Sequence, residues 1–540
     1  MLWRMAVAML SACGPSSVGG TPTAEALSGP GTFRDYVLTD PASVAASARA
    51  GTWLFNQSEI TGGGLAMEIA VDPWQTGFVT VGGDSWGLYN SRNAGNQWLP
   101  ALEGTAQAAM TGDKGTFYYS GLAYSKKERG VVYGLLGQVS ASGGGFVVMD
   151  GYKVRRINLA VSGAESQNRH DHPRPNGKRI LVDADSAGST EFIYVGGGKG
   201  TGVFRSTTQG ASFEAIGLAG TLATTDVITG MALDPADHTR LLVSTRDTKL
   251  YVLANLRGPA ASVAIQEVSI APHQFEELAA VNGVLWAAGR REGLFKSMDG
   301  GRTWTSAGTF PSSVDLVTVA GRGRSVFAGC VADGQTPHCI YRSLDGGASF
   351  TSVADNPSAL EWGSNQTWWH AAEKGSFING SGYVTSGIAL DAVNENIVYV
   401  AGRAGVWKSE DSGDTWRPAV VGLGGTMHEK FGWNGTDVMV SDVDFGCFKT
   451  SAADHFRAPA EASGCSFNPT SGLKVTAGAD IIEVVPPTAA GIPARFLVNG
   501  VDQADEFFKA GITRPKDVYY SQGYVYIAQF GGGVVLAHAK

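Results

Sequence analysis

A ten-residue segment recurs along this chain, and the recurrence limits the fold more than any other feature. Each copy begins with an aromatic residue, has Ser at its third position, Asp or a small polar substitute at its fifth and Gly at its seventh, and ends on an aromatic three residues after the Gly. The copies span 89–98, 204–213, 295–304, 341–350 and 407–416. Self-similarity of this kind indicates one supersecondary unit that is repeated and stacked on its neighbours.

The segment matches the Asp-box, whose residues suit a tight turn between two strands. The Asp or Asn side chain caps the turn, the Gly takes a positive φ, and the flanking aromatics pack between sheets. We therefore interpret Asp299, Asp345 and Asp411 as turn aspartates with a structural role.

The sequence around each copy predicts an all-β fold of propeller blades. Alternating strands precede the boxes, as in residues 397–407, so one unit runs strand, strand, turn, strand. Such a unit is the blade of a β-propeller. Weaker units fit 107–157, 226–268, 427–459, 476–510 and 515–539, which gives about seven to ten blades at a spacing near 45 residues.

These blades can close one large ring or two smaller rings. Residues 351–380 interrupt the repeat and separate two halves that open alike, one near Gly62 and one near Gly382. We therefore expect a first propeller region at 51–350, a connecting segment at 351–380, and a second propeller region or ring-closing blades at 381–540.

Composition excludes several classes of protein. The chain has 540 residues, of which 43% are hydrophobic and only 17% charged, so it can bury a large core and is not disordered. The net charge is -8 and the sequence has no basic stripe, which argues against a nucleic-acid partner. No later segment approaches the run of about 18 apolar residues that a membrane span requires.

The N-terminus resembles a bacterial lipobox. A short apolar run ends at Leu10-Ser11-Ala12-Cys13, and Gly-, Ser-, Pro- and Thr-rich sequence follows. The resemblance implies a signal over 1–13, lipidation of Cys13 and a flexible tether over 14–50. We therefore expect a protein that is exported and either secreted or anchored to the cell envelope by lipid alone, and that is a monomer.

Four cysteines remain after Cys13, and they form two pairs that are close in sequence. Disulfides Cys330–Cys339 and Cys447–Cys465 are the simplest interpretation in an oxidising compartment. A zinc site is the weaker alternative, because no His stands at ligand spacing. We expect no metal site and no cofactor.

The order of motifs resembles glycoside hydrolase family 74, the two-propeller xyloglucanases. The run Gly83-Asp84-Ser85-Trp86-Gly87-Leu88-Tyr89 is similar to the segment that carries the general base in that family, which implies this role for Asp84. A second element, residues 168–183, aligns Arg179 with a family Arg. Residues 443–448 are similar to the segment of the general acid, which implies this role for Asp444, with Asp442 as the fallback.

The chain also departs from the family pattern. Lys178 replaces a family Glu, and Gly424-Gly425 stands where the family carries paired glutamates. Only about 96 residues follow Asp444, so the second ring is expected to be small.

The resemblance implies an inverting hydrolase of a β-1,4-glucan such as xyloglucan. One carboxyl group protonates the leaving oxygen, and the other activates water from the opposite face. Flat aromatic surfaces against the sugar rings and one guanidinium are expected to bind the polysaccharide, and the residues we assign to this role are Trp86, Arg179, Trp362, Trp368, Trp369 and Trp433.

Two other classes of function stay open. One is a non-catalytic surface propeller that binds a glycan or a protein, which the missing glutamates favour. The other is a different propeller carbohydrate enzyme, a sialidase or a polysaccharide lyase. The absence of a Phe/Tyr-Arg-Ile-Pro motif argues against a sialidase.

Overall fold

The fold was analysed in a computed structural model of the chain. The structure describes residues 53–57, 66–83, 87–101, 119–136, 145–150, 153–157, 179–185, 188–197, 200–224, 226–270, 273–312, 314–331, 340–353, 385–402, 405–420, 423, 428–433, 436–442, 446–451, 460–461, 472–486, 494–504, 515–529 and 534–539. One short 3-10 helix, η4 (Ala260–Ser262), interrupts the strands of this part of the chain. No helix in the described ranges is long and apolar enough to cross a membrane.

The described strands form ten four-stranded antiparallel sheets, so the predicted all-β fold is confirmed. In nine of them, four consecutive strands lie side by side in chain order, as a propeller blade requires, and the first seven of these along the chain are blades 1 to 7. Blade 1 is β2 (Ala66–Val71), β3 (Val79–Gly83), β4 (Leu88–Ser91) and β5 (Leu99–Ala101); blade 2 is β6 (Tyr119–Tyr124), β7 (Val131–Leu136), β8 (Gly145–Asp150) and β9 (Lys153–Ile157); blade 3 is β10 (Ile180–Ala184), β11 (Glu191–Gly196), β12 (Val203–Ser206) and β13 (Glu214–Gly217); blade 4 is β14 (Ile228–Asp234), β15 (Asp237–Thr245), β16 (Leu250–Ala254) and β17 (Ala264–Val268); blade 5 is β18 (Phe275–Val281), β19 (Val284–Gly289), β20 (Gly293–Ser297) and β21 (Thr305–Ala307); blade 6 is β22 (Asp315–Arg322), β23 (Ser325–Val331), β24 (Ile340–Ser343) and β25 (Thr351–Ser352); blade 7 is β26 (Thr385–Leu390), β27 (Val398–Gly402), β28 (Gly405–Ser409) and β29 (Arg417–Pro418).

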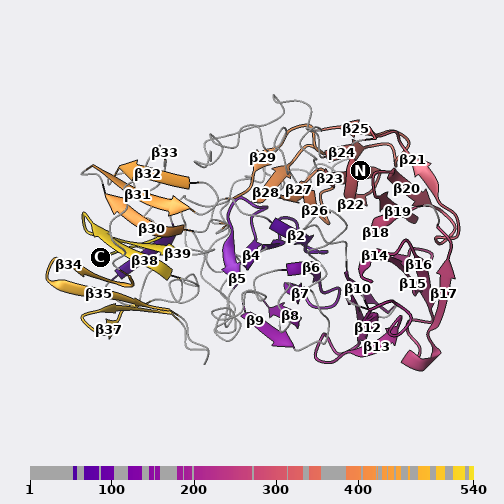
Figure 1. Ribbon diagram of the computed structural model, residues 1–540, viewed down its shortest axis with the longest axis horizontal. Coiled ribbons are helices and arrows are strands. Elements are labelled where there is room, and N and C mark those ends of the chain that lie inside the picture. The colour runs from indigo at the N-terminus through magenta and orange to yellow at the C-terminus, as the bar shows by residue number, and fades with distance from the viewer. Residues whose placement is uncertain are drawn as a thin grey trace, which may run out of the picture.

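These seven blades close a ring. The first strand of each blade contacts the first strand of the next, and β26 of blade 7 contacts β2 of blade 1 (Figure 1). Residues 351–380 were expected to divide two rings, but the blade that follows them packs between blades 6 and 1. Residues 381–540 were expected to form either a second propeller or ring-closing blades. The first sheet of this region closes the ring, because β26 packs between β22 of blade 6 and β2 of blade 1.

Three further sheets lie beside the ring (Figure 1). They contain β30 (His428–Trp433), β31 (Asp437–Asp442), β32 (Gly446–Ser451) and β33 (Ala460–Glu461); β34 (Lys474–Ala477), β35 (Asp480–Val485), β36 (Arg495–Val498) and β37 (Val501–Asp502); and β38 (Pro515–Ser521), β39 (Tyr524–Gln529), β40 (Val534–Ala539) and β1 (Trp53–Gln57). The β38 sheet contacts both of the others, so it lies between them although it comes last in the chain.

Strand β1 corrects the predicted boundary at residue 51. It pairs antiparallel with β40, from Trp53 opposite Ala539 to Gln57 opposite Val535. The ring of Trp53 packs against Phe496 with centroids 5.1 Å apart. Residues 53–57 therefore belong to the sheet that ends the chain and not to the seven-bladed ring, because their backbone pairs with β40 and the Trp53 side chain is buried.

The first strands carry small side chains where the blades converge on the axis. In the first strand of six blades, a large apolar residue is followed by Ala, as in Ile69-Ala70 and Met231-Ala232. The seven positions are Ala70, Ala123, Leu181, Ala232, Ala279, Ala320 and Ala389. Larger side chains at all of them would overfill the space between converging sheets.

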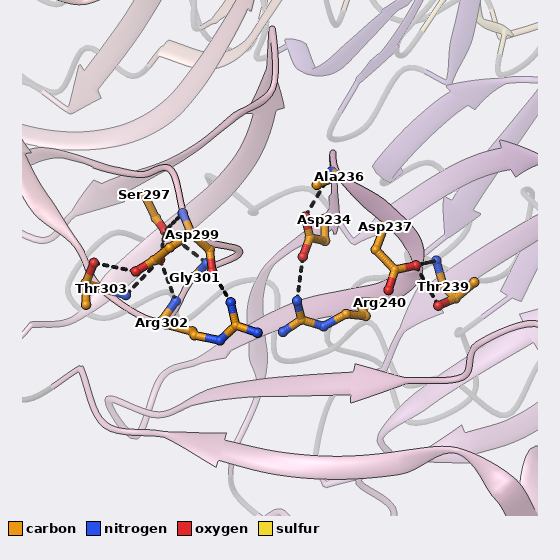
Figure 2. A network of polar contacts seen from close by, with 10 residues as sticks. All are labelled: Asp234, Ala236, Asp237, Thr239, Arg240, Ser297, Asp299, Gly301, Arg302 and Thr303. Carbon is orange, nitrogen blue, oxygen red and sulfur yellow. Dashed lines mark hydrogen bonds and ion pairs between the residues drawn. The ribbon is translucent and has the colours of Figure 1, made fainter.

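The five repeated turns share one hydrogen-bond pattern. In the turn of blade 5, Ser297 Oγ donates to Asp299 Oδ1, and Gly301 N donates to Ser297 Oγ (Figure 2). The other oxygen, Asp299 Oδ2, accepts from Thr303 Oγ1 at 2.6 Å. Equivalent bonds surround Asn93, Thr208, Asp345 and Asp411. The predicted structural role of these aspartates therefore agrees with their geometry.

In the turns of blades 6 and 7, the residue before the repeated Ser ties neighbouring blades together. Lys408 Nζ of blade 7 is fully buried and donates to the Ala94 carbonyl in the turn of blade 1, at 2.7 Å. Arg342 Nη1 of blade 6 donates to the Ser412 carbonyl in the turn of blade 7, at 2.8 Å. Burial lowers the pKa of Lys408, and the carboxylate of Glu410 at 2.7 Å opposes that shift. This position, unassigned in the sequence motif, therefore joins each such blade to the next.

The predicted Cys330–Cys339 disulfide is wrong. Cys330 lies in β23 as a buried thiol inside the main hydrophobic cluster, and its side chain is not half of a disulfide. Strand β23 is central in its sheet, and Cys330 lies opposite Leu316 of β22, so packing holds this side chain in the core. Cys447 in β32 is disulfide-bonded. Cys339 and Cys465 lie outside the described residues, so Cys465 as the partner of Cys447 stays a prediction.

Candidate functional site

Each blade has two rims at which polar residues can gather. We call the end where the second strand leads into the third the 2–3 rim, and the end where the first strand leads into the second the 1–2 rim. Because every blade runs in the same direction from the axis outwards, all 2–3 rims of the ring lie at one end of the axis.

The two predicted catalytic residues fall in 2–3 loops of two different sheets. Asp84 follows β3 and precedes β4, and Asp444 follows β31 and precedes β32. Both residues lie outside the described ranges, but the strand ends that border them are defined. Gly83 N donates to the Gly87 carbonyl at 2.9 Å, and Asp442 lies opposite Gly446. The two loops therefore hold equivalent places in blade 1 and in the β30 sheet.

The fallback residue Asp442 is the last residue of β31, where it pairs with His428 of β30. Its backbone belongs to the strand ladder, whereas Asp444 belongs to the loop. Loop positions at a blade rim are where propellers and barrels present functional side chains, which favours Asp444 over Asp442.

Trp433 lies at the other end of the same sheet. The register of β30 with β31 runs from His428 opposite Asp442 to Trp433 opposite Val438. Five residues of strand separate the two ends by about 17 Å. Trp433 is half-buried against the main hydrophobic cluster. The structure thus separates Trp433 from the Asp444 loop, and a contact with a substrate held there is not supported.

Arg179 is buried where the prediction places a substrate contact. The residue immediately precedes β10, has 2% of its surface exposed, and accepts a hydrogen bond from Gly196 N at its carbonyl. Its guanidinium is therefore enclosed by the ring, which argues for a structural role. The remaining predicted residues lie outside the described ranges: Cys13, Trp86, Trp362, Trp368 and Trp369.

A polar cluster that the sequence reasoning missed occupies the 2–3 rim of blades 4 and 5. Asp226, two residues before β14, accepts hydrogen bonds from Val227 N and from Asp247 N of the 2–3 loop of blade 4. Burial, followed by repulsion from Asp247, raises the pKa of Asp226 above its ordinary value. A buried carboxyl group with a raised pKa can hold a proton near neutral pH more readily than an exposed one.

Blade 5 contributes a second part of this cluster. His273 Nδ1 lies 2.5 Å from Glu292 Oε2, and the His273 ring packs on Phe295 with centroids 4.4 Å apart. Arg291 N donates to Asp315 Oδ1 of blade 6 at 3.1 Å. The polar runs 245–249 and 289–293, each between two strands, are the sequence signal that could have located the cluster.

Within the described ranges, no three His, Cys, Asp or Glu side chains are grouped as a metal site requires. The cluster at blades 4 to 6 therefore consists of paired carboxylates, one imidazole and backbone donors. Such groups can bind a polar ligand or orient a loop. They belong to blades 4 to 6, whereas the Asp84 loop belongs to blade 1.

Among known proteins, the chain is similar to solved structures in fold but not in sequence. No protein-family profile matches the chain, and no curated protein sequence matches it either.

Two solved structures are similar over most of the chain. The GH74 xyloglucanase from Xanthomonas campestris aligns with a TM-score of 0.65 and 14% identity, over 90% of this chain and 100% of its own. The GH74 enzyme from Niastella koreensis aligns with a TM-score of 0.59 and 15% identity, over 89% of this chain and 73% of its own. At this identity the likeness establishes a β-propeller architecture of the kind found in GH74 enzymes.

Proposed function

We propose that this protein is a glycoside hydrolase that cleaves a β-1,4-glucan such as xyloglucan with inversion. The observation that carries the proposal is the equivalent placement of two loops, 84–86 and 443–445, in a fold similar to that of GH74 xyloglucanases. Asp84 is the proposed general base and Asp444 the proposed general acid.

The proposed reaction needs the two carboxyl groups to face each other across the glycosidic bond. Inverting enzymes hold them about 6.5–9.5 Å apart, which leaves room for the attacking water. The acid donates its proton to the leaving oxygen while the base takes one from the water, so the sugar is released with inverted configuration. The chemistry is hydrolysis, which consumes only water and requires no cofactor.

We further propose that Trp86, Trp362, Trp368 and Trp369 supply apolar surfaces for the sugar rings, since pyranose faces pack on indole rings. Export with lipidation at Cys13 would place the enzyme, as a monomer, at the cell envelope, where polysaccharide is met. Mass spectrometry of the membrane fraction would detect a diacylated Cys13, and an unmodified soluble chain would count against the anchor.

The function is tested by incubating the full chain with tamarind xyloglucan and following new reducing ends. We expect cleavage, and we expect Asp84→Asn and Asp444→Asn to lower kcat by at least about 100-fold, because each removes one of the two proton transfers. Asp442→Asn is the matched control and should retain activity. Unchanged thermal unfolding of the variants would show that the fold survives.

Two results would count against the proposal. One is cleavage that persists in both substituted proteins. The other is an absence of cleavage with xyloglucan, mixed-linkage glucan and carboxymethyl-cellulose.

A non-catalytic glycan-binding propeller is the second candidate, and the substitutions Lys178 and Gly424-Gly425 favour it. Saturable binding of xyloglucan oligosaccharides without any cleavage by the wild-type protein would support this alternative.

A further inference from the structure

The ring encloses a cavity on its axis at the 1–2 rim. Its volume is about 730 Å³, within the range of about 300–1,000 Å³ that small-molecule sites occupy. The last residues of the seven inner strands and the turns that follow them form the wall. The 1–2 rim and the 2–3 rim that carries the Asp84 loop are opposite ends of the axis, so this cavity is separate from the site proposed for hydrolysis.

The wall is predominantly apolar. Side chains such as Leu122, Val182, Leu278 and Ile388 contribute to it, together with the alanines that lie where the blades converge. Near the other rim, by contrast, Met67, Glu276 and Ser386 at the beginnings of three inner strands are at most 2% exposed. The residues that line the cavity thus lie toward the 1–2 rim.

Three basic side chains line the cavity, and they come from alternate blades. Lys126 follows the inner strand of blade 2, His238 lies at the start of β15 in blade 4, and Arg322 ends the inner strand of blade 6. No Asp or Glu is among the described residues that line the cavity.

Two of the three basic groups are held in place by their neighbours. His238 Nδ1 lies 3.0 Å from Asp183 Oδ1, which leaves the other ring nitrogen for a ligand, and the side chain is 46% exposed. Arg322 Nη1 donates to the Asp391 carbonyl at 2.8 Å. The other N–H groups of the guanidinium can donate to a ligand. Lys126 is exposed.

Three acidic residues near this rim, Asp391, Asp234 and Asp183, are bonded to other groups of the protein. Asp391 accepts from Thr76 Oγ1 and from Gly77 N of blade 1, and Asp234 pairs with Arg240 at 2.7 Å (Figure 2). Asp183 pairs with Arg257 as well as with His238. These carboxylates are buried and satisfied, so the groups that face the cavity carry positive or no charge.

We propose that this axial cavity binds a small organic anion with an apolar body, of the aliphatic carboxylate class. The apolar part occupies the wall of small and branched side chains, and the carboxylate meets Arg322, Lys126 and His238 at the opening. Charge-assisted hydrogen bonds to a carboxylate are the strong ones, and Arg suits it in a two-point geometry.

Calorimetric titration of the full chain with octanoate tests the site. We expect saturable 1:1 binding, and at least about tenfold weaker binding of 1-octanol, which lacks the charge, and of inorganic phosphate, which lacks the apolar part.

Two substitutions test the basic groups against a close control. Arg322→Gln is expected to weaken octanoate binding about tenfold, the loss of one charge-assisted interaction. Arg324→Gln is the control, since Arg324 lies two residues away, is exposed and does not line the cavity. Lys126→Gln, on another blade, repeats the test in case the first variant unfolds.

A fourth variant fills the cavity. Ala280 lines it and is exposed, so Ala280→Trp should abolish octanoate binding while the thermal unfolding midpoint stays near the wild-type value. Three results would overturn the proposal: no saturable heat with octanoate, equal binding of 1-octanol or phosphate, or unchanged affinity in both Arg322→Gln and Lys126→Gln.

Discussion

At the scale of single residues, the repeated turns show that an aspartate can be conserved within a chain for structure alone. Asp299 accepts hydrogen bonds from Thr303 Oγ1, Ser297 Oγ and the backbone N–H groups of Arg302 and Thr303. Those donors, the Thr303 hydroxyl first, lower the pKa of Asp299 from 3.8 to about 2. The ionised carboxylate therefore stabilises this turn more than a protonated carboxyl group would.

This geometry predicts an acid-dependent contribution to stability from Asp299. Because the folded-state pKa is depressed, the contribution is full above a pH of about 3.8 and is lost as the pH falls toward 2. Asp299→Ala should lower the free energy of unfolding by about 1 kcal/mol at pH 7, through loss of the cap.

Asp299→Asn is the matched variant, since blade 1 carries Asn93 at the same place with a bond to Gln97 N at 2.9 Å. It should cost less than Asp299→Ala at pH 7, and its difference from the wild type should shrink between pH 5 and pH 2. Denaturant unfolding across this range measures both effects. A difference that does not change with pH would contradict the assignment.

At the scale of elements, each turn docks on the blade before it. The second Gly of the blade 6 turn, Gly347, has a φ of 84°, and a Cβ placed there would lie 2.1 Å from Trp286 Cη2 of blade 5. The Trp286 side chain is only 1% exposed. The docking of the blade 6 turn on blade 5 therefore depends on the absence of a side chain at this position.

Gly347→Ala should destabilise the protein by about 2–4 kcal/mol, which combines the strain of a positive φ with overpacking. Gly346→Ala separates the two causes, because Gly346 has a φ of 76° but nothing within 4 Å of its Cβ position. We expect it to cost only about 1 kcal/mol. Thermal unfolding of both variants measures the difference, and equal losses would show that packing on Trp286 is unimportant.

At the scale of the whole molecule, the described chain divides into a closed seven-bladed ring and a stack of three sheets. The ring needs no strand from outside 66–418, whereas the last sheet takes its outer strand from residues 53–57. The stack is therefore completed by the chain segment that precedes the ring.

This arrangement predicts that the stack unfolds separately when β1 is lost. A chain that starts at residue 59 should lose a low-temperature unfolding step, or shift it downwards, while a chain that starts at residue 51 should behave like the full chain. Trp53→Ala, which removes a buried indole from the contact with Phe496, should lower the same step by about 3 kcal/mol. Differential scanning calorimetry distinguishes this from a uniform loss of stability.

The sequence by itself determined the unit of the fold. Ser297, Asp299 and Gly301 act within five residues of one another, so the motif that contains them is sufficient to predict the turn, the strands on both sides and the structural role of the aspartates. The same locality explains why the loops of Asp84 and Asp444 could be placed between particular strands.

Only the tertiary structure decided how the units are joined. The closure of the ring by β26 on β2, the position of the β38 sheet between two others, and the pairing of β1 with β40 all join segments that are hundreds of residues apart or out of chain order. Neither local propensity nor spacing encodes such contacts, because many blades have compatible faces. The burial of Arg179 and of the Cys330 thiol likewise depends on how the strands pack in the closed ring, which the sequence does not show.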